Sequence, residues 1–123
     1  MKTKPYKMLV VDDEPGIREL LLDILNFLGY QSIMAANGVE ALETLTRNEV
    51  DLIISDIRMP QMSGIELLKA VKNQNLEIPF VLISGYKVNE VDKVFAEGLA
   101  NGFLAKPFGI EQIKALIAKL LPA

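Results

Sequence analysis

The 123-residue sequence contains neither cysteine nor histidine. Without cysteine, it has no disulfide scaffold and no thiolate metal site. Without histidine, it has no imidazole-based catalytic triad, no imidazole zinc site and no phosphohistidine carrier. Acid–base or metal chemistry must therefore come from carboxylates, lysine, hydroxyl groups and the backbone.

Strong net charge and long apolar runs are also absent. The net charge of −3 at pH 7 is too weak to gather nucleic acid, so no direct nucleic-acid partner is expected. The apolar stretch at residues 8–11 is too short for a signal-peptide core, and no run reaches membrane-spanning length. We therefore expect a cytoplasmic protein without membrane contact.

The composition is that of one globular unit. Hydrophobic residues make up 50% of the chain and charged residues 24%. This length suits one domain with a sizeable core, expected to span residues 1–123. The sequence ends just after its last helical pattern, so no separate output domain is expected.

Short apolar runs alternate with longer amphipathic patterns. The runs lie at residues 8–11, 52–54 and 80–83 and are typical of strands covered on both faces, as in a parallel sheet. Residues 31–35 and 103–105 are weaker strand candidates. Hydrophobic residues at three- and four-residue steps predict helices near residues 15–28, 38–45, 64–71, 88–97 and 110–120. The chain therefore reads as strand then helix, repeated about five times.

Several helix ends carry their own signals. Pro15 suits a first helical turn, and Gly29 suits a helix end. Asn37 and Ser63 each have a glutamate three residues later, which is the spacing of a capping box. These residues indicate where three of the helices begin and where the first one stops.

The predicted fold class is α/β. We expect a flavodoxin-like (βα)5 three-layer sandwich, with a parallel five-stranded sheet in the order 2-1-3-4-5. An eight-unit barrel would need about twice this length.

Polar residues follow four of the predicted strands. In an open parallel sheet, ligands collect beyond the carboxyl ends of the strands, so these residues should meet at one edge. They are Asp12, Asp13 and Glu14 after the first strand, Ser55 and Asp56 after the third, Ser84 and Gly85 after the fourth, and Lys106 and Pro107 after the fifth.

The carboxylates at this edge predict a magnesium site. Crowded carboxylates repel one another, and a hard divalent cation with oxygen ligands relieves that repulsion. Asp13 and Asp56 are the candidate direct ligands, with Asp12 binding directly or through water. A backbone carbonyl just after Asp56 completes the set, and that of Arg58 is the nearest suitable one. Mn²⁺ is the alternative cation.

The same edge predicts phosphoryl chemistry. Lys106 adds a mobile positive charge and Ser84 a hydroxyl donor. With a metal ion and a backbone N–H, they would cradle a phosphoryl group. An aspartate carboxylate can attack phosphorus while the positive groups neutralise the equatorial oxygens. Asp56 is the central carboxylate and is the predicted nucleophile.

Four motifs in register cover essentially the whole chain. They are residues 10–15 (Val-Val-Asp-Asp-Glu-Pro), residues 56–60 (Asp-Ile-Arg-Met-Pro) with Gly64, residues 83–85 (Ile-Ser-Gly) and residues 102–108 (Gly-Phe-Leu-Ala-Lys-Pro-Phe). Together they resemble the motifs of the receiver domains of response regulators in two-component signalling. The resemblance is to the type of regulator that consists of a single receiver domain. The resemblance implies that Asp56 is the phosphoacceptor, that Asp12 and Asp13 hold Mg²⁺, and that the Arg58 carbonyl is the backbone ligand.

The resemblance also implies a switch. Ser84 and Lys106 match the hydroxyl and lysine that contact the phosphoryl group, and Phe103 sits at the switch aromatic. The peptide bond before Pro107 is expected to be cis. The phosphoryl group would carry close to −2 charge, Ser84 would bond it, and Phe103 would turn in, which shifts a pre-existing equilibrium.

The partners follow from the same resemblance. A histidine kinase or histidine phosphotransfer protein is the implied donor, and a downstream effector protein reads the face formed by the fourth helix, fifth strand and fifth helix. The domain would not be an enzyme in the usual sense, although it would assist its own Mg-dependent phosphorylation and dephosphorylation.

Some positions depart from the family pattern. Ser84 stands where threonine is commoner, and Phe103 where tyrosine is common. Arg58 and Tyr86 lie two residues past the acceptor and the switch serine, where side chains shield or admit attacking water. Residues 99–101 (Leu-Ala-Asn) lack the acids usual in regulators that dimerise on DNA. A monomer or weak dimer is therefore expected.

Three other classes of protein fit this sequence less well. A haloacid-dehalogenase phosphatase also uses an aspartate and Mg²⁺, but it needs an acid where this chain has Arg58. A nucleotide-binding module needs a glycine-rich loop after the first strand, where this chain has Asp-Asp-Glu-Pro. A degenerate receiver would lack the acceptor, the acidic pair or the lysine, and all are present here.

Overall fold

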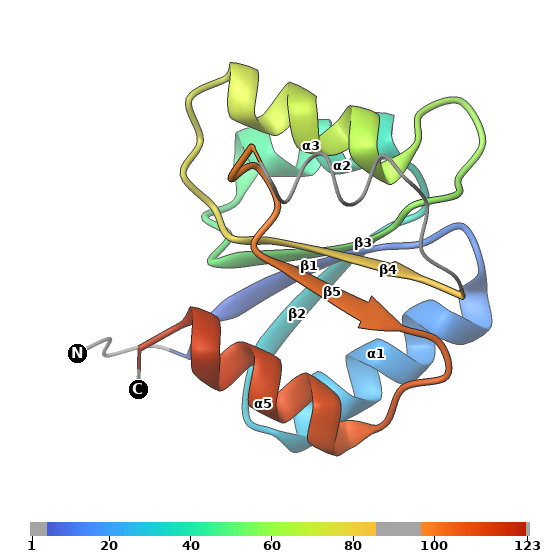
Figure 1. Cartoon of the computed structure of the whole chain (residues 1–123), viewed down its shortest axis with the longest axis vertical. Coiled ribbons are helices and arrows are strands. Elements are labelled where there is room, and N and C mark those ends of the chain that lie inside the picture. Colours follow the sequence, from blue (N-terminus) through green and yellow to red (C-terminus); the bar gives the residue numbers. More distant parts are fainter. Residues whose placement is uncertain (1–4, 86–96, 123) are drawn as a thin grey trace.

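The computed structural model describes residues 5–85 and 97–122, which form three layers (Figure 1). Its elements are β1 (Lys7–Val11), α1 (Pro15–Phe27), β2 (Gln31–Ala35), α2 (Gly38–Arg47), β3 (Leu52–Asp56), α3 (Gly64–Asn73), β4 (Phe80–Ser84), β5 (Gly102–Ala105) and α5 (Ile110–Leu120). The helix expected at residues 88–97 lies, except for its last residue, outside the described part of the chain.

One five-stranded parallel sheet organises the molecule. Its order is β2-β1-β3-β4-β5, so the predicted flavodoxin-like α/β fold is confirmed. Two strands run further than their apolar stretches, because Asp56 still pairs with Ile83 and Ser84 with Ala105. A polar side chain at a strand end leaves the backbone ladder intact, so hydrophobicity alone placed these ends too early.

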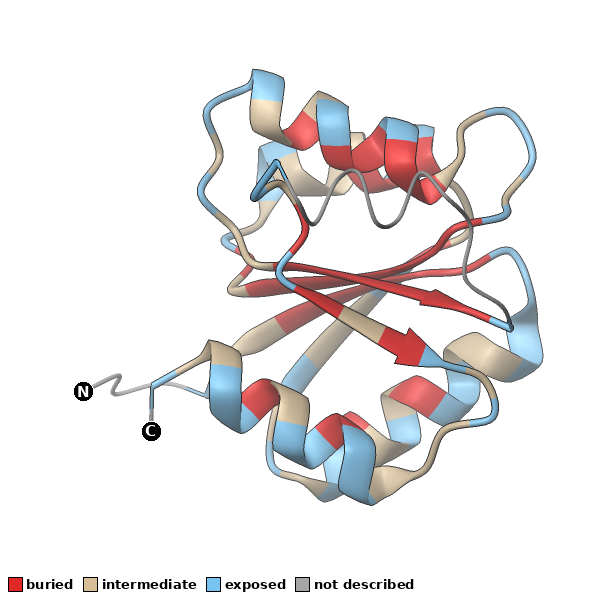
Figure 2. Ribbon diagram, in the orientation of Figure 1, coloured by how far each residue is buried: buried red, intermediate tan, exposed pale blue. Residues whose placement is uncertain are grey.

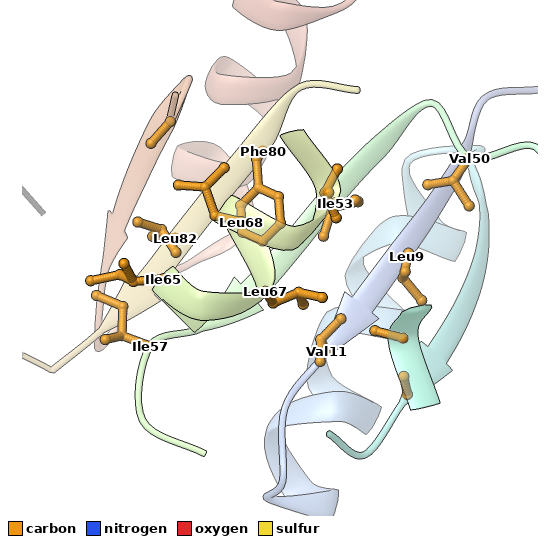
Figure 3. Close-up of a cluster of buried hydrophobic side chains, with 14 residues drawn as sticks. Leu9, Val11, Val50, Ile53, Ile57, Ile65, Leu67, Leu68, Phe80 and Leu82 are labelled. Atoms are coloured by element: carbon orange, nitrogen blue, oxygen red, sulfur yellow. The ribbon is translucent and has the colours of Figure 1, made fainter. Parts of the chain in front are cut away.

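The central strands of the sheet are buried along most of their length (Figure 2). Their alternating residues build a core on each face of the sheet. Leu9 of β1 faces α2 and α3, in a cluster with Leu68 and Phe80 (Figure 3). Its neighbour Met8 faces α1 and α5, in a cluster with Leu21. Each such side chain contributes about 1.5–3 kcal/mol when fully buried. Within the described ranges, no helix is long and apolar enough to cross a membrane.

The predicted helix starts differ in how fully they are capped. Ser63 makes both bonds of a capping box at the start of α3, as expected. Asn37 accepts from the backbone N–H of Glu40, but the Glu40 carboxylate accepts from the N–H of Ala36 and not from that of Asn37. The second box is therefore half of the predicted one. Gly29 has a φ of 92°, which suits its predicted place after α1.

Candidate functional site

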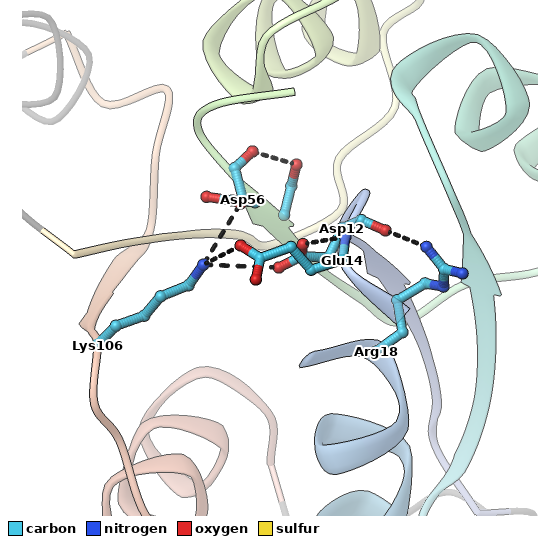
Figure 4. A network of polar contacts seen from close by, with 6 residues as sticks. Asp12, Glu14, Arg18, Asp56 and Lys106 are labelled. Atoms are coloured by element: carbon cyan, nitrogen blue, oxygen red, sulfur yellow. Dashed lines mark hydrogen bonds and ion pairs between the residues drawn. The ribbon is translucent and has the colours of Figure 1, made fainter. Parts of the chain in front are cut away.

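Three strand ends bring charged side chains to the carboxyl edge of the sheet (Figure 4). Asp12 follows β1 and Asp56 ends β3, and these two strands are neighbours. Lys106 follows β5, and its backbone N–H donates to the carbonyl of Ser84 at 2.9 Å. The peptide bond from Lys106 to Pro107 is cis, as the resemblance implied. The sheet thus gathers residues separated by up to 94 positions.

The Lys106 ammonium lies among three carboxylates. Its Nζ is 3.4 Å from Asp56 Oδ2, 3.7 Å from Glu14 Oε1 and 3.9 Å from Asp12 Oδ2. The contact with Asp56 also has hydrogen-bond geometry. One ammonium cannot neutralise three carboxylates, so the site keeps an excess of negative charge.

Four carboxylates form one cluster. Asp12, Asp13, Glu14 and Asp56 each offer an oxygen, and these atoms all lie within 4.8 Å of one another. Asp12 and Asp56 are buried, whereas Asp13 and Glu14 are exposed. Asp12 Oδ1 accepts from the Glu14 backbone N–H at 2.9 Å, but its Oδ2 has no hydrogen-bond partner among the described residues. A buried carboxylate oxygen without a donor is costly unless a cation compensates it.

The crowding and burial change the acidity of these groups. Burial chiefly raises the pKa of Asp12 to about 6, and the Asp56 charge adds to this effect. Burial also raises the pKa of Asp56, against the lowering effects of Lys106 and of backbone hydrogen bonds from Arg58 and Ile57. Burial works to lower the pKa of Lys106, but the Asp56 and Asp12 charges outweigh it and raise that pKa. The Lys106 ammonium therefore stays protonated, and a further cation would stabilise the charged form of the carboxylates.

The residues present fit a hard divalent cation. All the clustered donors are carboxylate oxygens, which Mg²⁺ prefers, and one of them is the unpartnered Oδ2 of Asp12. Asp13 and Arg58 both line an adjoining hollow of about 540 Å³, so the cluster is open on that side. Such an opening leaves room for the waters that Mg²⁺ keeps.

Two contacts hold the loops around the cluster. Arg18, on α1, donates from Nη1 to the carbonyl of Asp12 at 2.7 Å. Gly64 donates its backbone N–H to the carbonyl of Ile57 at 2.8 Å. A Cβ on Gly64 would lie 2.2 Å from the carbonyl oxygen of Asp56, so only glycine allows this approach. Both contacts fix the backbone that carries a cluster aspartate.

The other predicted site residues lie around this cluster. Ser84 is buried at the end of β4. Arg58 lies two residues beyond Asp56, beside the hollow that it shares with Asp13. Phe103 on β5 is partly buried and packs against the core under α2 and α3. Tyr86 lies outside the described residues.

Sequence reasoning missed two contacts. It placed Glu14 at the edge but did not pair it with Lys106, and it did not connect Arg18 to Asp12. A charged residue one turn into the first helix was the available signal for Arg18. For Glu14, no local pattern indicates which of several acids a distant lysine contacts.

The chain matches a known protein family over nearly all of its length. Residues 8–118 match the family described as the response regulator receiver domain. The chain therefore belongs to this family, as its motifs predicted.

Individual relatives agree with that assignment. The chain is 39% identical over 116 residues to sporulation initiation phosphotransferase F of Bacillus subtilis, and the matched region covers 94% of each protein. The solved structure of chemotaxis protein CheY4 from Vibrio cholerae is similar with a TM-score of 0.89 at 34% identity, over 95% of this chain and 99% of that one. Response regulator TrrA from Thermotoga maritima, solved with Mg²⁺-BeF, has a TM-score of 0.83 at 34% identity, over 94% of this chain and 99% of that one.

Family membership defines the general function. The chain is a phosphoacceptor signalling switch of two-component and phosphorelay systems. Receiver domains bind Mg²⁺ at an acidic pocket and interact with histidine kinases or phosphotransfer proteins and with effectors. They are not enzymes in the usual sense, which decides against the phosphatase alternative.

Proposed function

We propose that Asp56 is the residue that accepts the phosphoryl group. Its carboxylate ends the central strand β3, and its Oδ2 has the shortest contact with Lys106, at 3.4 Å. Asp12 has no exposed surface, whereas Asp56 retains a little. Asp56 therefore combines access for a donor with a positive charge at the reacting group, and this combination carries the proposal.

The transfer exchanges one bond to phosphorus for another. An Asp56 carboxylate oxygen attacks, the new O–P bond forms as the bond from phosphorus to the leaving group breaks, and the leaving group keeps the electron pair. Lys106 stays beside the phosphoryl oxygens and neutralises part of their charge. The buried Ser84 hydroxyl donates to the same oxygens.

The carboxylates of Asp12, Asp13 and Asp56 and the carbonyl of Arg58 would hold Mg²⁺, or Mn²⁺ in its place. The clustered oxygens and the unpartnered Asp12 Oδ2 support this ligand set. The bound ion supplies charge neutralisation at the phosphoryl oxygens. Because hydrolysis needs the same neutralisation, the domain assists its own dephosphorylation as well as its phosphorylation.

Phe103 and its surroundings would carry the signal outward. Phe103 lines a mostly apolar groove of about 490 Å³ with Leu116 and Lys119 of α5. When Ser84 bonds the phosphoryl group, Phe103 turns inward and reshapes this groove for a downstream effector. The fourth helix, which would complete the face, lies outside the described residues.

The donor would be a histidine kinase or a histidine phosphotransfer protein in the cytoplasm. A hollow of about 320 Å³ beside Lys106 is lined by Ile17, Leu20, Pro107 and Phe108. Its apolar walls lie next to the ammonium that contacts Asp56, so a protein that delivers phosphorus there would cover them. The receiver would act as a monomer or weak dimer.

The test uses acetyl phosphate with Mg²⁺ and intact-mass measurement. The unmodified sequence should gain the mass of one phosphoryl group, and hydroxylamine should remove it because acyl phosphates are labile. Asp56→Asn should gain none, since an amide is not nucleophilic enough. Asp23→Asn, at an exposed position on α1, is the matched control and should label normally. Equal labelling of the Asp56 variant would sink the assignment.

A further inference from the structure

Glu14 is an unexpected partner of Lys106. Its side chain is 63% exposed, yet its Oε1 lies 3.7 Å from Nζ. This distance is intermediate between the Asp56 and Asp12 contacts of the same ammonium. In Figure 4 the Glu14 carboxylate lies between Lys106 and Asp12. Glu14 therefore shares the ammonium with the proposed acceptor.

The start of α1 does not depend on the Glu14 side chain. Glu14 is the N-cap residue, but within the described chain its side chain makes no capping hydrogen bond. Pro15 opens the helix with its preset φ and without an N–H that needs a partner. The Glu14 backbone N–H is already satisfied by Asp12 Oδ1. Its carboxylate is thus free to act on Lys106.

We propose that Glu14 is a positioning residue that holds Lys106 partly away from Asp56 and so slows phosphoryl transfer. This inference rests on the proposed role of Asp56. Asp56 and an incoming phosphoryl group both need the ammonium, and Glu14 competes with them for it. A lysine ammonium on a flexible stem moves readily between such partners.

Glu14 also adds negative charge beside the path of an anionic donor. Among the described residues, the cluster holds four carboxylates against the Lys106 ammonium. Removing the Glu14 charge should weaken the repulsion of acetyl phosphate and release Lys106. Because Glu14 is exposed and screened by water, the expected change in rate is moderate, about two- to fivefold.

The experiment compares three variants of the whole chain. Glu14→Gln removes the charge at nearly constant size, and Glu14→Asp keeps it. Glu19→Gln removes an exposed carboxylate more than one turn further along α1 and is the matched control. The labelling rate with acetyl phosphate is measured at saturating Mg²⁺ for each protein, so that a changed metal affinity does not enter. NMR of the Lys106 ε-methylene, assigned with Lys106→Arg, is recorded without metal.

Glu14→Gln should label about two- to fivefold faster and shift the Lys106 signal. Glu14→Asp should stay within about twofold of the unmodified rate, and Glu19→Gln should change neither quantity. An unchanged rate or an unchanged Lys106 signal in Glu14→Gln overturns the proposal, and so does an equal acceleration in Glu14→Asp or Glu19→Gln. If the unmodified chain does not label at Asp56, the proposed function itself fails, which is a separate result.

Discussion

The amino and carboxyl edges of the sheet, where its parallel strands begin and end, satisfy their polar side chains to different degrees. At the amino edge, Asp51 Oδ2 accepts from the Lys7 N–H at 2.8 Å, and Asn101 Oδ1 accepts from the Phe80 N–H at 2.9 Å. At the carboxyl edge, Asp12 Oδ2 is buried without a hydrogen-bond partner among the described residues. The amino edge satisfies these side chains with hydrogen bonds to neighbouring strands, whereas the carboxyl edge leaves a carboxylate oxygen of Asp12 that a cation could compensate.

The contrast shows where the fold gives up stability for function. Polar side chains at the amino edge are at most partly buried and accept from backbone N–H groups, so placing them there costs little. The carboxyl edge concentrates like charges, which destabilises the metal-free fold but prepares a site for a cation and a phosphoryl group. Removing the carboxylate of an aspartate should therefore stabilise the metal-free protein at the carboxyl edge and destabilise it at the amino edge.

The largest expected effect is that of Gly64→Ala, at the carboxyl edge. The added Cβ would meet the Asp56 carbonyl at 2.2 Å, and backbone cannot yield as a flexible side chain does. We expect a loss of about 3 kcal/mol in the free energy of unfolding, measured by urea denaturation. Gly16→Ala, where no atom of the described residues lies within 4 Å of an added Cβ, is the control and should be neutral or slightly stabilising. A loss below about 1 kcal/mol at Gly64 would mean that the loop yields.

Asp12→Asn should have the next largest effect and the opposite sign. It removes a buried charge that nothing in the described chain hydrogen-bonds at Oδ2, so the metal-free protein should gain about 2 kcal/mol at pH 7. Added Mg²⁺ should stabilise the unmodified protein and have little effect on the variant. Urea midpoints with and without Mg²⁺ measure both changes.

The pH dependence of stability tests whether the buried Asp12 charge causes the effect of Asp12→Asn. The pKa of Asp12 is about 6 in the fold, above its usual 3.8, so the folded state binds the proton more tightly than the unfolded state. The metal-free protein should therefore gain stability as the pH falls from 7 to about 5. Asp12→Asn should lack this part of the gain. A variant with the full pH response would assign the effect to another group.

Asp51→Ala, at the amino edge, should have the smallest effect. It removes the acceptor of the Lys7 N–H, which costs about 1–2 kcal/mol because that donor is only partly buried. Asp23→Ala, at an exposed position of α1, should stay within about 0.5 kcal/mol. If Asp51→Ala stabilised the protein, the contrast between the two edges would not hold.

Much of the fold could be predicted because its signals are local. The short segments predicted as strands match the ends of all five observed strands within one or two residues. Ser63 and Gly29 lie at the helix boundaries that they predicted. The Glu40 carboxylate went to Ala36 and not to Asn37, because two neighbouring N–H groups compete for one acceptor. Such choices depend on small differences in geometry that residue types do not encode.

For the site, the order of strands carried the prediction. Once Asp12, Asp56 and Lys106 stand at carboxyl ends of parallel strands, the topology brings them to one edge. The roles of these residues, and those of Ser84 and Phe103, stay predictions that labelling and mutation will test.

Residue type and spacing were enough to predict the alternation of strands and helices, the sheet order and the set of residues that meet, because periodicity and chain topology depend on them. Three features came from the folded arrangement alone: Asp12 Oδ2 has no donor among the described residues, Gly64 approaches the Asp56 backbone, and Glu14 shares Lys106. These are matters of a few ångströms among groups far apart in the chain. The effects of burial and charge on these groups depend on those distances, which only the packing of the whole chain sets.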